Sequence, residues 1–143
     1  MSFFDHLFFG GYSPDLHEQL KGLSVDCSSY NGSNVYQATA IVMLLVSLVL
    51  MLNYYYGLFN DPRFTYRRVW LLHILVACLI VGGFAYLSAA SYLPEEKHCS
   101  DLHFGTLDCS LFALTEMGYT AIVCILLSLL FKWKSVSNKK IPF

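Results

Sequence analysis

Three long apolar stretches constrain the fold of this chain more than any other feature. They cover residues 36–56, 69–91 and 111–131, and none of them contains proline or lysine. Each is long enough to cross a hydrocarbon core of about 30 Å, which needs about 20 helical residues. Backbone polar groups inside lipid must be satisfied within the spanning segment, so these stretches are expected to be helices. The sequence therefore predicts an all-α integral membrane protein with three transmembrane helices.

The composition agrees with a membrane location. Of the 143 residues, 56% are apolar and only 13% are charged, and the mean hydropathy is +0.51. A soluble domain carries about 25% charged residues, and a disordered chain contains few apolar residues. The formal net charge of −1 gives no basic surface for nucleic acid. This balance argues against disorder, nucleic-acid binding and most small soluble enzymes, and leaves the lipid bilayer as the first expected partner.

The basic residues predict the orientation. Seven of the nine Lys and Arg residues lie in two segments, 57–68 and 132–143, whereas Lys21 and Lys97 lie in the other two connecting segments. Positively charged residues gather on the cytoplasmic side of membrane proteins. We therefore expect a cytoplasmic first loop, a basic cytoplasmic C-terminal tail and an extracytoplasmic N-terminus. The sequence does not indicate which membrane holds the chain.

The N-terminal segment, residues 1–35, is expected to form two short helices. Ser2 and Asp5 have the spacing of a capping box, and five large apolar residues follow within residues 3–9. This pattern predicts a short interfacial helix in the outer headgroup layer. The alternative is that these apolar side chains pack on a neighbouring protein.

The second short helix has clearer boundaries. Ser13 can act as its N-cap, Pro14 suits the first helical position, and Gly22 can end it after Lys21. A turn-rich linker then leads to the first span.

The second connecting segment, residues 92–110, contains Cys99 and Cys109, and Cys27 is expected on the same side. Cysteines in an oxidising compartment usually form disulfides. We expect a bridge between Cys99 and Cys109, with Cys27 as the rival partner. Either pairing leaves one thiol over.

The same segment also contains His98 and His103. Histidine and cysteine are zinc and copper ligands, but the residues here follow no recognised metal-site spacing. A thiol-redox enzyme would need a Cys-x-x-Cys pair or a close variant, and the chain has none. We therefore predict no metal, no cofactor and no catalytic residues, with His98 and His103 as weak metal candidates only.

Small and polar residues recur at intervals of four in the second and third spans. Such stripes let helices approach closely and hydrogen-bond to one another. The stripes comprise Glu116, Thr120, Cys124 and Ser128 in the third span, and Cys78 with Gly82 and Ala85 with Ala89 in the second. Three interpretations stay open. The stripes could pack the chain's own helices together, line a polar pathway in an oligomer, or dock onto a partner chain.

His73 lies about one turn inside the cytoplasmic end of the second span. An ionisable residue within a span is a candidate functional group because its burial in lipid is costly. His73 could contact haem or a quinone, as in small three-helix membrane anchors of respiratory enzymes. One chain offers a single intramembrane histidine, so haem would need a second copy or a partner. A hydrogen bond near the interface is the simpler interpretation.

These observations favour a non-catalytic, small multi-pass subunit that anchors, braces or helps assemble a larger membrane complex. Its expected partners are unlike membrane-protein subunits, although self-association is possible. The first alternative is a homo-oligomeric cation channel or pore that uses Glu116. The second is a redox anchor that binds haem or quinone through His73.

Overall fold

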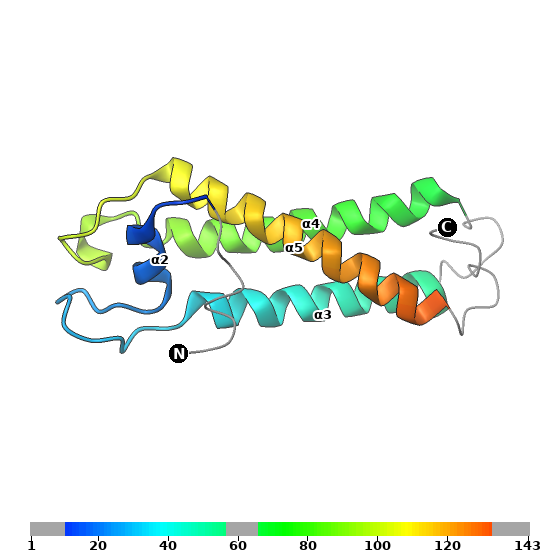
Figure 1. The fold of residues 1–143 in the computed structure, drawn as a ribbon, viewed down its shortest axis with the longest axis horizontal. Helices are drawn as coiled ribbons and strands as arrows, with labels where there is room; N and C mark the ends of the chain where they lie inside the picture. The colour runs from blue at the N-terminus through cyan, green and yellow to red at the C-terminus, as the bar shows by residue number, and fades with distance from the viewer. Residues whose placement is uncertain (1–10, 57–65, 133–143) are drawn as a thin grey trace. The chain divides into compact units, whose positions relative to one another are not determined.

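A computed structural model describes residues 11–56 and 66–132, and every regular element in these ranges is helical (Figure 1). The helices are α2 (Pro14–Leu20), α3 (Val35–Tyr56), α4 (Arg67–Ala90) and α5 (Thr106–Lys132), with a short 3₁₀ helix, η2 (Glu95–Lys97). The helices α3, α4 and α5 are each long and apolar enough to cross a membrane. The chain is thus a multi-pass membrane protein, as the sequence predicts. The interfacial helix expected near the N-terminus lies outside the described residues.

The short helix α2 forms as its sequence predicts. Ser13 is the N-cap, and its side chain accepts the backbone N–H of Leu16. Pro14 occupies the first turn, where its missing N–H costs nothing. Gly22 follows the helix with φ of +94°, a backbone conformation that favours glycine. These local signals fix both ends of α2.

All three long helices begin before the expected spans, α3 by one residue, α4 by two and α5 by five. The helix α5 begins at Thr106, although its apolar stretch begins only at Leu111. Asp108, in the first turn, accepts the backbone N–H of Gly105 at 3.0 Å. A carboxylate that reaches back to the N-cap position satisfies a backbone N–H that the helix leaves open. This contact explains why the polar turn before the apolar stretch is already helical.

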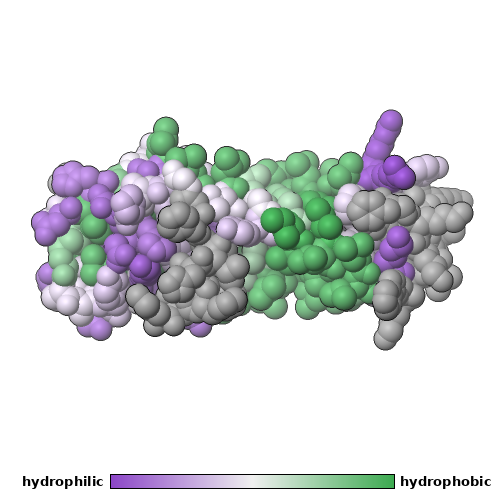
Figure 2. All heavy atoms as spheres, viewed as in Figure 1, coloured by the Kyte–Doolittle hydropathy of each residue, from purple (hydrophilic) through white to green (hydrophobic). Residues whose placement is uncertain are grey.

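The chain divides into two compact units. Unit 1 comprises Met1–Ile41 and Gly82–Glu116, and unit 2 comprises Val42–Val81 and Met117–Phe143. The helices α3, α4 and α5 contribute residues to both units. On the face shown in Figure 2, the loops of unit 1 are largely hydrophilic, whereas the helices of unit 2 are largely hydrophobic.

The core of unit 2 is built from large side chains of α3 packed against small and medium ones of α4 and α5. Its buried members are Met51, Tyr54, Tyr55, Ile74, Ala77, Cys78 and Cys124. The opposite faces of the helices carry exposed leucine, isoleucine and valine side chains, for example Leu45, Leu72 and Leu130. A helix that exposes apolar residues to its surroundings suits lipid rather than water.

Candidate functional site

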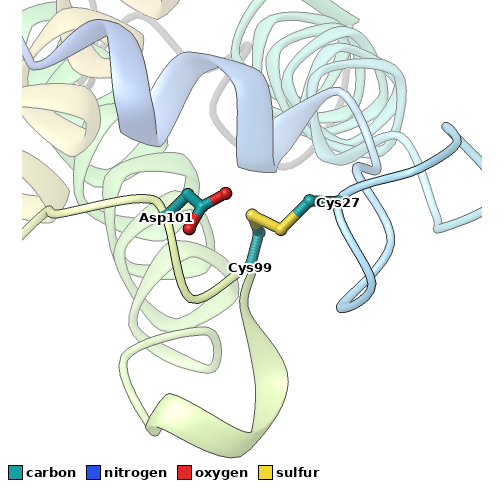
Figure 3. A group of neighbouring side chains, drawn as sticks. All are labelled: Cys27, Cys99 and Asp101. Atoms are coloured by element: carbon teal, nitrogen blue, oxygen red, sulfur yellow. A yellow bond between two sulfur atoms is a disulfide. The ribbon is translucent and has the colours of Figure 1, made fainter.

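A disulfide between Cys27 and Cys99 joins the linker after α2 to the connection between α4 and α5 (Figure 3). Cys109 is a free, buried thiol. The expected Cys99–Cys109 bridge is therefore wrong, and Cys99 pairs with the rival partner. The error has a physical reason. Cys109 lies in the first turn of α5 and is fully buried, whereas the linker carries Cys27 to Cys99 with a Cα–Cα distance of 5.3 Å.

A tight turn presents Cys27 to its partner. The N–H of Ser24 donates to the carbonyl of Ser29, and the N–H of Cys27 donates to the carbonyl of Ser24. Cys27 itself adopts φ of 56°, in the left-handed region that few non-glycine residues occupy. The bridge and the turn together hold this conformation.

Two side chains of α2 and one of α5 hold the segments of unit 1 together. The Asp15 carboxylate accepts the N–H of His103 at 3.1 Å, and the Gln19 side chain accepts the N–H of Cys99 at 3.4 Å. Asp108 also accepts the N–H of Ser13 at 3.0 Å. These contacts satisfy backbone groups that come from distant parts of the sequence. The segment from α2 to the linker is thus bound to the α4–α5 connection by hydrogen bonds as well as by the disulfide.

An aromatic cluster that the sequence analysis missed forms the interior of unit 1. The Tyr36 hydroxyl lies 2.7 Å from the Tyr12 hydroxyl and 2.6 Å from Nδ1 of His17. The ring of Phe112 meets Tyr12 and Tyr36 edge-on, with centroids 5.5 and 5.7 Å apart. Such pairs stabilise a core while the hydroxyl groups keep hydrogen-bond partners. Phe112 lies far from Tyr12, His17 and Tyr36 in the sequence, so no local pattern predicts the cluster.

Glu18 carries the clearest electrostatic contact of the unit. It forms an ion pair with Lys21 at 2.9 Å and accepts the Tyr30 hydroxyl. These two hydrogen bonds hold the pKa of the Glu18 carboxyl below its usual value. The same carboxylate raises the pKa of Tyr30. Both side chains are near the surface, so the contacts are typical of a solvated face.

The cysteine-rich region does not form a metal site in this oxidised state. Cys27, Cys99 and Asp101 place their ligand atoms within 4.8 Å of one another, but the two sulfurs are bonded to each other (Figure 3). Metal binding requires thiolates, which a disulfide does not offer. His98 and His103 line one shallow cavity of about 400 Å³, where Nδ1 of His98 donates to backbone carbonyls. They stay weak candidates for a metal.

The stripe in α5 is buried within the chain. Glu116, Thr120, Cys124 and Ser128 are all fully buried. The small residues of α4 that recur at the same interval, Cys78, Gly82, Ala85 and Ala89, are buried as well. The side chains predicted to pack helices or to line a pathway thus face the interior of one chain.

Ser128 joins all three long helices within unit 2. The indole N–H of Trp70, on α4, donates to the Ser128 hydroxyl at 2.7 Å. The hydroxyl of Tyr55, on α3, lies 2.6 Å from the same oxygen. Ser128 is fully buried, so its removal would leave these two polar groups without a shared partner.

Replacing Ser128 with alanine should destabilise unit 2. The substitution removes the shared partner of two polar groups, and interhelical hydrogen bonds in membrane proteins contribute up to about 1.7 kcal/mol each. We expect the free energy of unfolding to fall by about 1–2 kcal/mol in a detergent titration followed by circular dichroism. The matched control is Ser110→Ala on the same helix, because Ser110 is exposed and its hydroxyl donates to the carbonyl of Thr106 within its own helix. An equal effect of both substitutions would contradict the role of Ser128.

His73 is held by its own helix. Its Nδ1–H donates to the carbonyl of Val69 at 2.8 Å, and its ring lies 5.2 Å from that of Tyr54. The residue is only 8% exposed. Of the two roles expected for His73 from the sequence, a hydrogen bond is simpler than a contact with haem or quinone. The bond to Val69 uses Nδ1 and fixes the orientation of the ring, so Nε2 is the other ring nitrogen.

Comparison with known proteins identifies no family for this chain. No family model, curated protein or solved structure matches this chain. The candidate site therefore rests on the residues and their geometry.

Proposed function

We propose that the chain is a non-catalytic, small multi-pass membrane subunit that anchors, braces or helps assemble a larger membrane complex. The observation that carries this proposal is the burial of the α5 stripe. Glu116, Thr120 and Ser128 are each 0% exposed within a single chain. The polar groups of the span thus serve the packing of the chain itself, which is what a rigid structural subunit needs.

The geometry of unit 1 also supports a structural role. A disulfide and three hydrogen bonds from side chains to backbone hold its segments together. A rigid extramembrane cap offers a surface that unlike subunits can bind.

Both alternatives have less support. A homo-oligomeric cation channel would need Glu116 on a surface shared between copies, whereas Glu116 is buried in one chain. A haem or quinone anchor would need His73 to face its cofactor, whereas the ring is 8% exposed and lies against Tyr54. Neither alternative has a specific observation in its favour.

Two substitutions, Glu116→Gln and His73→Ala, distinguish the structural subunit from the channel and from the redox anchor. In native membranes that lack the chain, we expect one larger complex to shrink or disappear on a native gel. Glu116→Gln and His73→Ala should each restore that complex, because neither group acts chemically in a structural subunit. A conductance lost in Glu116→Gln would support the channel, and an absorption band lost in His73→Ala would support the redox anchor. Membranes in which no complex changes would contradict the proposal.

We also propose that the N-terminus and the α4–α5 connection face the extracytoplasmic side. The distribution of Lys and Arg supports this orientation. The Cys27–Cys99 disulfide supports it independently, because such bonds persist in oxidising compartments.

Single added cysteines test the orientation. The described free cysteines, Cys78, Cys109 and Cys124, are all buried, so they give little background. In intact cells or sealed organelles, a membrane-impermeant maleimide should label Ser100→Cys from the extracytoplasmic side. Tyr66→Cys should react only after the membrane is opened. Both native residues are exposed, which makes the two positions a matched pair. The reverse labelling pattern would overturn the orientation.

A further inference from the structure

A groove on the surface of α4 combines an apolar wall with a positively charged end. Its volume is about 390 Å³, and it belongs entirely to unit 2. The lining residues are Arg68, Leu71, Leu72, Ile74, Leu75 and Cys78. All of them lie on one helix, at the spacing of three or four residues that places side chains on a common face. We propose that this groove binds one anionic phospholipid of the surrounding bilayer.

The length of the groove matches one leaflet. Arg68 and Cys78 are ten residues apart on α4, and a helix rises about 1.5 Å per residue, so the groove runs for about 15 Å. The hydrocarbon core is about 30 Å thick, and each leaflet accounts for half of it. An acyl chain whose headgroup lies at Arg68 would thus end near Cys78. At this end of the groove, the buried Cys78 thiol donates to the carbonyl of Met117.

The charge at the open end selects the headgroup. Arg67 and Arg68 are both exposed in the first turn of α4. In the part of the chain that the structure describes, neither arginine forms an ion pair with a carboxylate. A guanidinium matches the geometry of a phosphate group and can donate two parallel hydrogen bonds to it. Arg68 lines the groove, and Arg67 adds a second positive charge in the same turn of α4. This charge favours a lipid with net negative charge over a zwitterionic one.

The apolar wall separates this site from a simple phosphate site. Leu71 and Leu75 are each more than half exposed, so they offer apolar surface rather than core packing. A free phosphate ion would gain nothing from that wall, whereas an acyl chain would lie along it. The proposal does not depend on the function proposed for the whole chain.

Trp70 provides an intrinsic reporter. It lies on α4 between Arg68 and Leu71, and the chain has one other tryptophan, Trp133. The full chain with Trp133→Phe would be placed in phosphatidylcholine vesicles, where brominated phosphatidylcholine or brominated phosphatidylglycerol replaces a fixed fraction of the lipid. We expect brominated phosphatidylglycerol to quench Trp70 more strongly. Adding Arg68→Gln should reduce the preference about fivefold.

Control measurements show whether the preference for phosphatidylglycerol depends on the groove. Lys132→Gln, which removes one positive charge at the end of α5 outside the groove, should change the preference less than twofold. Quenching by brominated phosphatidylcholine should be equal in all variants, which shows that each one is folded and embedded. Inorganic phosphate should reduce the preference no more than chloride at the same ionic strength. Equal quenching by the two lipids, equal losses in both charge variants, or specific competition by phosphate would each overturn the proposal.

Discussion

The chain with Cys99→Ser should lose about 2–4 kcal/mol of stability and expose a reactive thiol at Cys27. The bridge closes a loop between residues 72 positions apart, and a long closed loop restricts the unfolded chain strongly. The loss should be concentrated in unit 1, because both cysteines belong to it. Alkylation without reductant, followed by peptide mass spectrometry, identifies the free thiol, and thermal unfolding in detergent gives the loss of stability.

The matched variant is Cys109→Ala. Cys109 is a free, buried cysteine in the same unit, so its replacement should leave both Cys27 and Cys99 protected from alkylation. If Cys109→Ala instead freed the thiol of Cys99, the bridge would join Cys99 and Cys109, and the pairing described above would be incorrect.

Gly22→Ala should loosen the whole segment from α2 to the linker. Gly22 has φ of +94°, and an added Cβ would lie 2.6 Å from the carbonyl oxygen of Gly32. The backbone conformation alone costs an alanine about 1–3 kcal/mol. The close approach adds to that cost, because the N–H of Gly32 donates to the Gly22 carbonyl and holds these two segments together. We expect hydrogen exchange across residues 13–32 to speed up about 100-fold, which corresponds to about 3 kcal/mol.

Gly83→Ala is the control for this substitution. Gly83 lies within α4, also in unit 1, and an added Cβ would meet nothing within 4 Å. Alanine there should leave the exchange rates unchanged or slow them slightly, because glycine is a poor helix former. Similar exchange in the Gly22→Ala and wild-type chains would show that the contact with Gly32 does not hold the linker.

The long helices could be predicted from the sequence because their signal is local. A run of about 20 apolar residues determines a membrane helix almost by itself. The ends of α2 were predictable for the same reason, since Ser13, Pro14 and Gly22 act on their immediate neighbours. The early start of α5 was missed because hydropathy does not detect a polar turn that Asp108 stabilises.

The contacts of unit 1 depend on distant segments and could not be predicted in this way. The shorter separation in sequence favoured a bridge between Cys99 and Cys109. Which cysteine pairs with Cys99 depends instead on where the turn at Ser24–Ser29 places Cys27. The cluster of Tyr36 and Phe112 likewise combines residues that no local pattern connects. The stripe in α5 was predicted as a set, but only the structure places all four of its side chains in the interior.

The most direct test of the proposed role is the composition of what the chain binds in its own membrane. A tagged chain would be purified from native membranes in a mild detergent, and the eluate would be examined by quantitative mass spectrometry and by its visible spectrum. A structural subunit predicts unlike membrane proteins in a fixed ratio to the chain and a colourless chain in the wild type and in His73→Ala. A preparation that contains the chain alone, as a monomer or homo-oligomer, would contradict the proposal.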